Sequence, residues 1–147
     1  MFDIRHRIGI AVPQAQVHRA LATTEGVASW WTHDTHGDAG EGGKLLLQFG
    51  GPERRLVLEV VEVAADRITW SCLEGPDEWL GTTFTFELSR AEDETVVLFT
   101  HGGWRESVPF LAHCTTKWGY FLLGMKAELE HGQGTPFPGD LQISSWG

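Results

Sequence analysis

The chain has 147 residues, a length typical of one domain with a single hydrophobic core. Its 11 Lys and Arg stand against 20 Asp and Glu, and the resulting net charge of −9 argues against nucleic acid or an anionic membrane surface as a partner. The two cysteines lack CxxC spacing, the N-terminus has no signal-peptide pattern, and no apolar run approaches the roughly 20 residues that span a bilayer. We therefore expect a reduced, cytoplasmic protein.

The first part of the chain predicts one strand followed by two short helices. Apolar residues alternate with polar ones over 2–12, which indicates a strand with one buried face. A helix is expected near 13–22, and a second near 24–31, where a pair of threonines provides an N-cap and a pair of tryptophans ends the helix. The segment 32–43 is too polar and too rich in glycine for regular structure, so we expect a loop there.

Five further strands are predicted from alternating apolar residues between short turns. They cover residues 44–49, 55–63, 67–73, 81–88 and 95–104. The alternation changes phase at Val60 and Val61, where we expect a β-bulge.

One long helix is predicted from Ser107, as N-cap, to His131, with Gly132 as the C-cap signal. Apolar residues recur there at steps of three and four and therefore form one stripe. We predict an α+β fold in which a curved antiparallel sheet of about six strands grips this helix. The domain would occupy residues 1–135, and the Gly- and Pro-rich tail 136–147 would pack on it.

Several residues predicted to lie off the apolar stripe indicate that the outer side of the long helix is covered. Gly119 and Gly124 lie inside the helix, where glycine costs about 1 kcal/mol relative to alanine and therefore suggests close packing. Tyr120 and Leu123 are expected on the same side. Either the tail or a second copy of the chain in a homodimer would provide the cover.

Short motifs accompany this order of elements. They are Val12 and Pro13, the pair Trp30 and Trp31, Gly42 and Gly43, the run Ile68, Thr69 and Trp70, then Thr100, His101 and Gly103, and in the long helix Lys117, Trp118, Leu122, Lys126, Glu130 and Gly132. With them the chain resembles the START-like superfamily (SRPBCC) with its helix-grip fold, and more narrowly the bacterial branch related to the Hsp90 ATPase activator homologue domain. This resemblance covers nearly the whole chain. It is specific for the fold and weak for function, because the superfamily includes lipid carriers, hormone receptors and polyketide cyclases.

The resemblance implies an apolar cavity between the sheet and the long helix. The strand and helix phases direct a set of mostly aromatic side chains toward it: Trp70, Phe84, Phe86, Phe99, His101, Trp118, Phe121, Leu122 and Met125, with Trp30 and Trp31 near the mouth. The same residues could instead fill a solid core, since sequence does not distinguish a lined pocket from a filled one. His101 could act as a general acid or base there, or be a core histidine bonded to backbone.

Other kinds of site find little support. The cluster His33, Asp34, His36 and Asp38 lies in a short glycine-rich loop with no distant third ligand, so we expect a solvated loop and no metal. No phosphate loop or hydrolytic triad is indicated, and we expect no cofactor.

The leading hypothesis is a protein that binds a small apolar or aromatic ligand in the cavity, with His101 and Trp70 as the candidates for orienting it. A cyclase- or aromatase-like enzyme acting in the same cavity is the first alternative. An interaction protein resembling chaperone ATPase activators is the second. We expect no nucleic-acid or membrane partner.

Overall fold

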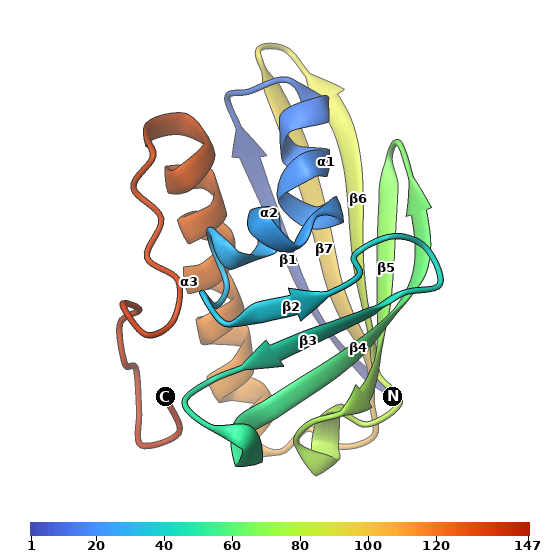
Figure 1. Cartoon of the computed structure of the whole chain (residues 1–147), viewed down its shortest axis with the longest axis vertical. Coiled ribbons are helices and arrows are strands. Elements are labelled where there is room, and N and C mark those ends of the chain that lie inside the picture. Colours follow the sequence, from blue (N-terminus) through green and yellow to red (C-terminus); the bar gives the residue numbers. More distant parts are fainter.

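A seven-stranded antiparallel sheet curves around one long helix in the computed structural model of the chain, which describes residues 1–147 (Figure 1). The strand order is β1-β7-β6-β5-β4-β3-β2, so every strand from β2 to β7 pairs with its neighbour in sequence, and β1 joins β7. The strands are β1 (Phe2–Ile10), β2 (Thr35–Gly37), β3 (Lys44–Gln48), β4 (Arg55–Ala64), β5 (Arg67–Glu74), β6 (Thr83–Ala91) and β7 (Glu94–Trp104). The helices are α1 (Gln14–Ala22), α2 (Thr24–Ala28) and α3 (Pro109–His131), with 3-10 turns η1 (Pro52–Arg54) and η2 (Asp77–Trp79).

This architecture confirms the predicted fold, with local corrections. The sheet has seven strands rather than six. The additional strand is β2, which pairs with Leu45 to Leu47 of β3 and lies within the segment 32–43, where a loop was expected. Helix α2 ends at Ala28 rather than near residue 31. The bulge is confirmed, since the β4–β5 register shifts between Val60 and Glu62.

The long helix α3 begins at Pro109, two residues after the predicted cap. Val108 is the N-cap, and no side chain caps the first turn. At the other end Gly132 adopts a left-handed conformation with φ of 67°, as the C-cap prediction required. No helix of the chain is long and apolar enough to cross a membrane.

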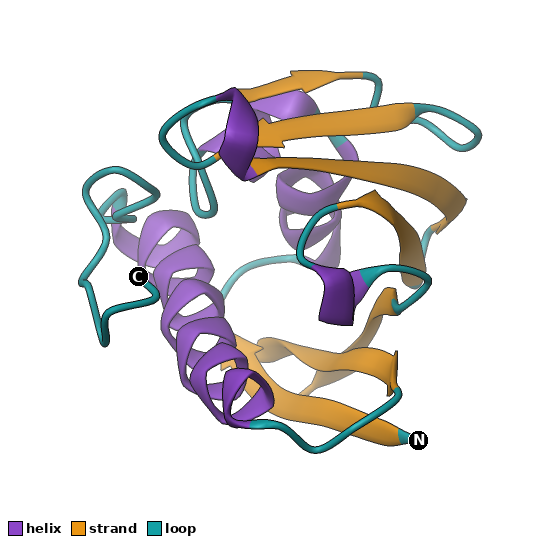
Figure 2. Cartoon of the chain, turned by 90° about the horizontal axis from the view of Figure 1, so that it is seen from below, coloured by secondary structure: helices purple, strands orange, loops and turns teal.

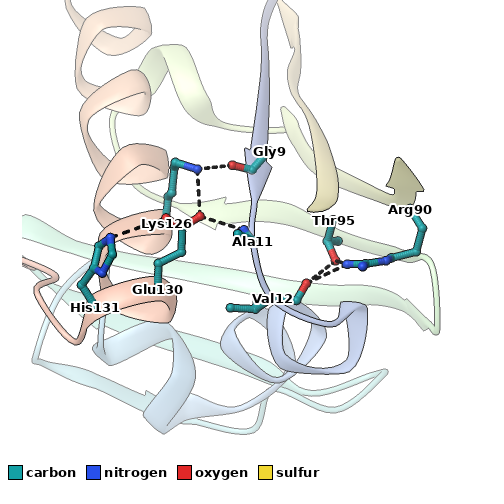
Figure 3. A network of polar contacts seen from close by, with 8 residues as sticks. All are labelled: Gly9, Ala11, Val12, Arg90, Thr95, Lys126, Glu130 and His131. Carbon is teal, nitrogen blue, oxygen red and sulfur yellow. Dashed lines mark hydrogen bonds and ion pairs between the residues drawn. The ribbon is translucent and has the colours of Figure 1, made fainter. Parts of the chain in front are cut away.

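Two charged side chains fix the C-terminal half of α3 to the end of β1 (Figure 3). The Lys126 Nζ donates to the carbonyl oxygen of Gly9 at 2.5 Å and to Glu130 Oε2 at 2.8 Å. The same Glu130 oxygen accepts from the backbone N–H of Ala11 at 2.7 Å. These bonds satisfy main-chain groups at the C-terminal end of β1 and just beyond it that have no partner in the sheet. They hold the C-terminal half of α3 against this edge of the sheet.

Residues 132–147, which include the predicted tail 136–147 and are together called the tail from here on, return along α3 on the side away from the sheet (Figure 2). Phe137 makes two main-chain hydrogen bonds, donating to the carbonyl of Trp31 at 2.9 Å and accepting from the N–H of His33 at 3.1 Å. The Tyr120 hydroxyl bonds the Thr135 hydroxyl at 2.5 Å. The tail therefore links α3 to the connection between α2 and β2.

The two helix glycines do not face an outer partner. A Cβ added at Gly119 would lie 3.7 Å from the His6 ring of β1, and one at Gly124 would lie 3.9 Å from the carbonyl oxygen of Trp30. Both distances are ordinary van der Waals contacts, so close packing does not explain these glycines. Of the predicted outer residues, Tyr120 contacts the tail, whereas Leu123 remains 57% exposed.

Candidate functional site

The space between the sheet and the middle of α3 is filled by stacked aromatic rings. Trp31 lies at their centre, parallel to Trp30 at 5.7 Å and to Trp70 at 5.9 Å between ring centroids. On its helix side, the Trp118 ring lies 5.0 Å away. Offset stacking of this kind adds to the burial free energy of large aromatic side chains. The centre of the grip is therefore a solid core, one of the two alternatives that the sequence left open.

Most of the residues predicted to line a cavity belong to this core. Eight of them have no exposed surface and lie outside the pocket wall: Trp30, Trp70, Phe84, Phe86, Phe99, His101, Leu122 and Met125. The other three, Trp31, Trp118 and Phe121, do line a pocket that begins where the core ends.

This pocket has a volume of about 730 Å³ and lies beside the N-terminal half of α3. Its walls come from that half of the helix, the tail, the turns η1 and η2, the residue that follows β3 and the start of β4. The aromatic residues that line it and that the sequence did not predict are Phe49, Trp79, Phe110, Phe137 and Trp146. The last two belong to the tail, so one wall of this partly open pocket comes from a segment outside the regular elements.

The His101 ring has no nitrogen free for a ligand. Its Nδ1 accepts a hydrogen bond from the Trp118 indole N–H at 3.2 Å. Its Nε2 lies 2.8 Å from Thr82 Oγ1, whose hydroxyl donates to the carbonyl of Trp79, so Nε2 must carry the proton and donate to Thr82. Burial lowers the pKa of His101 to about 3, and the ring is neutral at pH 7. In this arrangement His101 joins β7 to α3 and has no access to the pocket.

The pocket also holds a buried thiol. Cys114 lies on α3 and is 3% exposed. Burial raises its pKa to about 12, and burial raises that of Cys72 to about 11. Both cysteines therefore remain protonated near pH 7 and are weak nucleophiles, because the thiolate is the reactive form.

A lysine and an aspartate form the polar end of the pocket. Lys117 of α3 bonds Asp140 of the tail, with 2.6 Å between Nζ and Oδ2. Their side chains are only 14% and 3% exposed. Next to them the His113 Nδ1 bonds the Ser144 hydroxyl at 2.8 Å. Burial and the positive charge of Lys117 lower the pKa of His113, which favours its neutral form.

The polar loop residues of 32–43 do not converge on a metal site. His36 Nε2 lies 2.6 Å from Asp34 Oδ1 on the surface, and Asp38 Oδ1 accepts from the backbone N–H of Gly40. No group of three or more His, Cys, Asp or Glu side chains with metal-binding geometry is present in the chain. Asp38 thus has a local role in the turn that leads into β3.

Several solved structures share this fold of a curved sheet around a long C-terminal helix. The solution structure of the Aha1 dimer from Colwellia psychrerythraea is similar, with a TM-score of 0.83 and 38% identity over 91% of this chain and 100% of that one. Protein SSP2350 from Staphylococcus saprophyticus matches with a TM-score of 0.76 and 21% identity over 97% of this chain and 98% of that one. CalU16 from Micromonospora echinospora matches with a TM-score of 0.72 and 21% identity over 91% of this chain and 77% of that one.

The last two similarities show the fold alone, because their sequence identity is low. No curated protein matches the sequence. Residues 11–130 match the family described as Activator of Hsp90 ATPase homolog 1-like protein, which is most of the domain. Together with the Colwellia structure, this match identifies the chain as a member of that family, within the START-like superfamily.

Proposed function

We propose that the protein binds a small, uncharged and largely apolar ligand in the pocket beside the N-terminal half of α3. The observation that carries this proposal is a pocket of about 730 Å³ whose wall contains eight Trp and Phe side chains, beside charged groups that include Arg54, Glu78 and Lys117. Ligand sites in proteins are typically apolar clefts of about 300–1,000 Å³ with few polar groups. Trp31, Trp118 and Phe121 form the inner wall and are the proposed contacts.

Burial of apolar surface provides the affinity in this proposal. A bicyclic aromatic ligand that loses about 200 Å² of apolar surface to the pocket gains roughly 5 kcal/mol at 25 cal/mol per Å². Part of this gain is lost to the reduced freedom of the bound ligand, so an affinity of about 1 mM is the realistic expectation for a generic probe.

The first experiment is native mass spectrometry of the purified full chain, to detect a co-purified molecule. The second is calorimetric titration with 2-methoxynaphthalene as an apolar probe. Trp146→Ala should weaken probe binding several-fold, since Trp146 lines the pocket and is 56% exposed, so that its loss leaves the core intact. Phe2→Ala is the matched control, because Phe2 is also an aromatic side chain, is 47% exposed and lies outside the pocket. Absence of both a co-purified molecule and probe binding would refute the proposal.

We also propose that the chain forms a homodimer. The Colwellia relative, 38% identical to this chain, is described as a dimer. Leu123 on α3 is an exposed large apolar side chain that the tail does not cover, and we infer that the second copy contacts it. Sedimentation velocity at micromolar concentration should give a dimer for the wild type and a monomer for Leu123→Glu. A wild-type monomer would refute this proposal without affecting that for the pocket.

A further inference from the structure

The ion pair in the pocket wall has one unused bonding position, and it lies on the aspartate. Lys117 Nζ carries three protons and has three oxygen partners: Asp140 Oδ2 at 2.6 Å, the carbonyl of Leu141 at 2.6 Å and the carbonyl of Gly147 at 3.2 Å. It also lies over the rings of Tyr120 and Phe121, at 5.5 and 5.3 Å from the centroids. The lysine is therefore saturated and has no donor left for a ligand.

Asp140 is in the opposite situation. Its Oδ2 bonds Lys117, whereas its Oδ1 is buried and has no hydrogen-bond partner. An ionised carboxylate can accept several hydrogen bonds, and a buried oxygen that accepts none costs folding free energy. Asp140 also lines the pocket. Its surroundings therefore lack one donor, and the pocket is the side from which a donor can come.

We propose that Asp140 Oδ1 accepts a hydrogen bond from the ligand, so that the pocket selects uncharged aromatic molecules that carry a hydroxyl or N–H group. This inference rests on the proposed function and adds the polar requirement to it. The aromatic walls at Trp31, Trp118 and Phe121 hold the ring system, and Asp140 fixes its orientation at the tail end of the pocket.

The charges at this end disfavour ionised ligands. Asp140 and Lys117 neutralise each other, so a cationic ligand that approaches Oδ1 also meets the lysine. At Oδ1 a carboxylate ligand would bring a negative charge to an oxygen that already carries one, and no Lys117 proton is free to offset the repulsion. The other cations of the pocket wall, Arg54 and Arg55, lie in the turn η1 and at the start of β4. A neutral donor avoids both costs.

Access to Oδ1 requires the tail to shift, and the tail is suited to this. Oδ1 lies beneath the pocket surface, so the ligand must displace neighbouring tail atoms to reach it. Beyond Asp140 no residue is fully buried, and Leu141 and Trp146 are 63% and 56% exposed. Segments with few buried contacts open at low free-energy cost, without disruption of the sheet.

The test compares two probes with the same ring system on the full wild-type chain by isothermal titration calorimetry. 2-Naphthol can donate a hydrogen bond, whereas 2-methoxynaphthalene can only accept one. Since hydrogen bonds to charged groups are the strong ones, 2-naphthol should bind about tenfold more tightly or better.

A substitution then assigns the preference to Asp140. In Asp140→Asn the amide oxygen can still accept from Lys117, while the amide nitrogen takes the place of Oδ1 and replaces the acceptor by a donor. In this variant the two probes should bind with about equal affinity, and the affinity for 2-methoxynaphthalene should not decrease. Glu53→Gln is the matched control, because Glu53 is an exposed acid in the same wall and its loss should leave the preference unchanged.

The outcomes separate this inference from the proposed function. Equal affinity of wild type for 2-naphthol and 2-methoxynaphthalene would overturn the role of Asp140 and leave the apolar pocket standing. Loss of the preference in Glu53→Gln would assign it to general negative potential and not to Asp140. Failure of both neutral probes to bind would overturn the proposed function together with this inference.

Discussion

The buried position of His101 predicts a specific acid sensitivity of folding. The ring is fully buried, and its two nitrogens are used by Trp118 and Thr82. The informative perturbation is His101→Gln, because the glutamine amide can accept from the indole and donate to the hydroxyl but does not titrate. Comparison of the two proteins over a range of pH isolates the contribution of this one ring.

The magnitude follows from the two pKa values. Burial lowers the pKa of His101 from 6.5 to about 3 in the folded chain, whereas in the unfolded chain the ring titrates near 6.5. Between these values the unfolded state binds one more proton than the folded state, so the free energy of unfolding decreases as the pH falls. The slope is about 1.4 kcal/mol per pH unit, and acidification from about pH 7.5 to about pH 5 should cost wild type about 2 kcal/mol more than the variant.

The assay is urea unfolding followed by far-ultraviolet circular dichroism at several pH values. His131→Gln is the control, since its side chain is 65% exposed and the variant should keep the wild-type pH dependence. Equal pH dependence in wild type and His101→Gln would refute the reasoning and show that the ring is protonated or solvated in the folded protein.

Three further predictions concern the contacts of α3. Trp118→Ala should lower the free energy of unfolding by about 3–5 kcal/mol through loss of a large core side chain. Trp118→Phe should lower it by about 1–3 kcal/mol, because His101 Nδ1 loses its hydrogen-bond donor. A loss below about 1 kcal/mol for the alanine variant in urea unfolding would contradict the packing described. Lys117→Met should release the tail and speed amide hydrogen exchange over residues 140–147. Lys126→Met should leave this exchange unchanged, because Lys126 joins α3 to β1 and not to the tail. Equal protection of the tail in both variants would contradict this prediction. Cys114 should react with a thiol reagent at pH 8 far more slowly in the native protein than in urea, and equal rates would show that it is accessible.

Residues in regular elements were predictable because their periodicity records which face is buried. Phe84, Phe86 and Leu88 alternate with polar residues along β6, and all three point into the core. The helix phase likewise identified Trp118 and Phe121 as buried. Strand β2 was missed because three residues are too few to show an alternation, and its pairing with β3 depends on main-chain hydrogen bonds that any sequence can make.

The pocket was less predictable than the core that borders it. The direction of a side chain follows from phase, but whether facing side chains meet or leave space depends on their summed volumes and on ring stacking. Trp31 shows the difference, since its stacks with Trp30 and Trp70 fill the centre, where the sequence allowed either a cavity or a solid core. Trp79 and Phe137 lie in a turn and in the tail, where no periodicity assigns a direction.

The position of the pocket follows from how the two halves of α3 are held. The C-terminal half is fixed to the edge of β1 through Lys126 and Glu130, so no space opens there. The N-terminal half has no side-chain cap, and across the pocket it faces mainly the turns η1 and η2 and the tail, with only the start of β4 as a strand in the wall. Such segments are not bound by the pairing geometry of a sheet, so they can leave a space that a continuous strand would close. The tail is joined to this half of the helix chiefly through Lys117, and the group that the tail brings into the wall is Asp140. The Lys117–Asp140 ion pair thus holds the tail against the pocket and also provides the pocket with a polar group. A ligand that bonds Asp140 would therefore act directly on the tail.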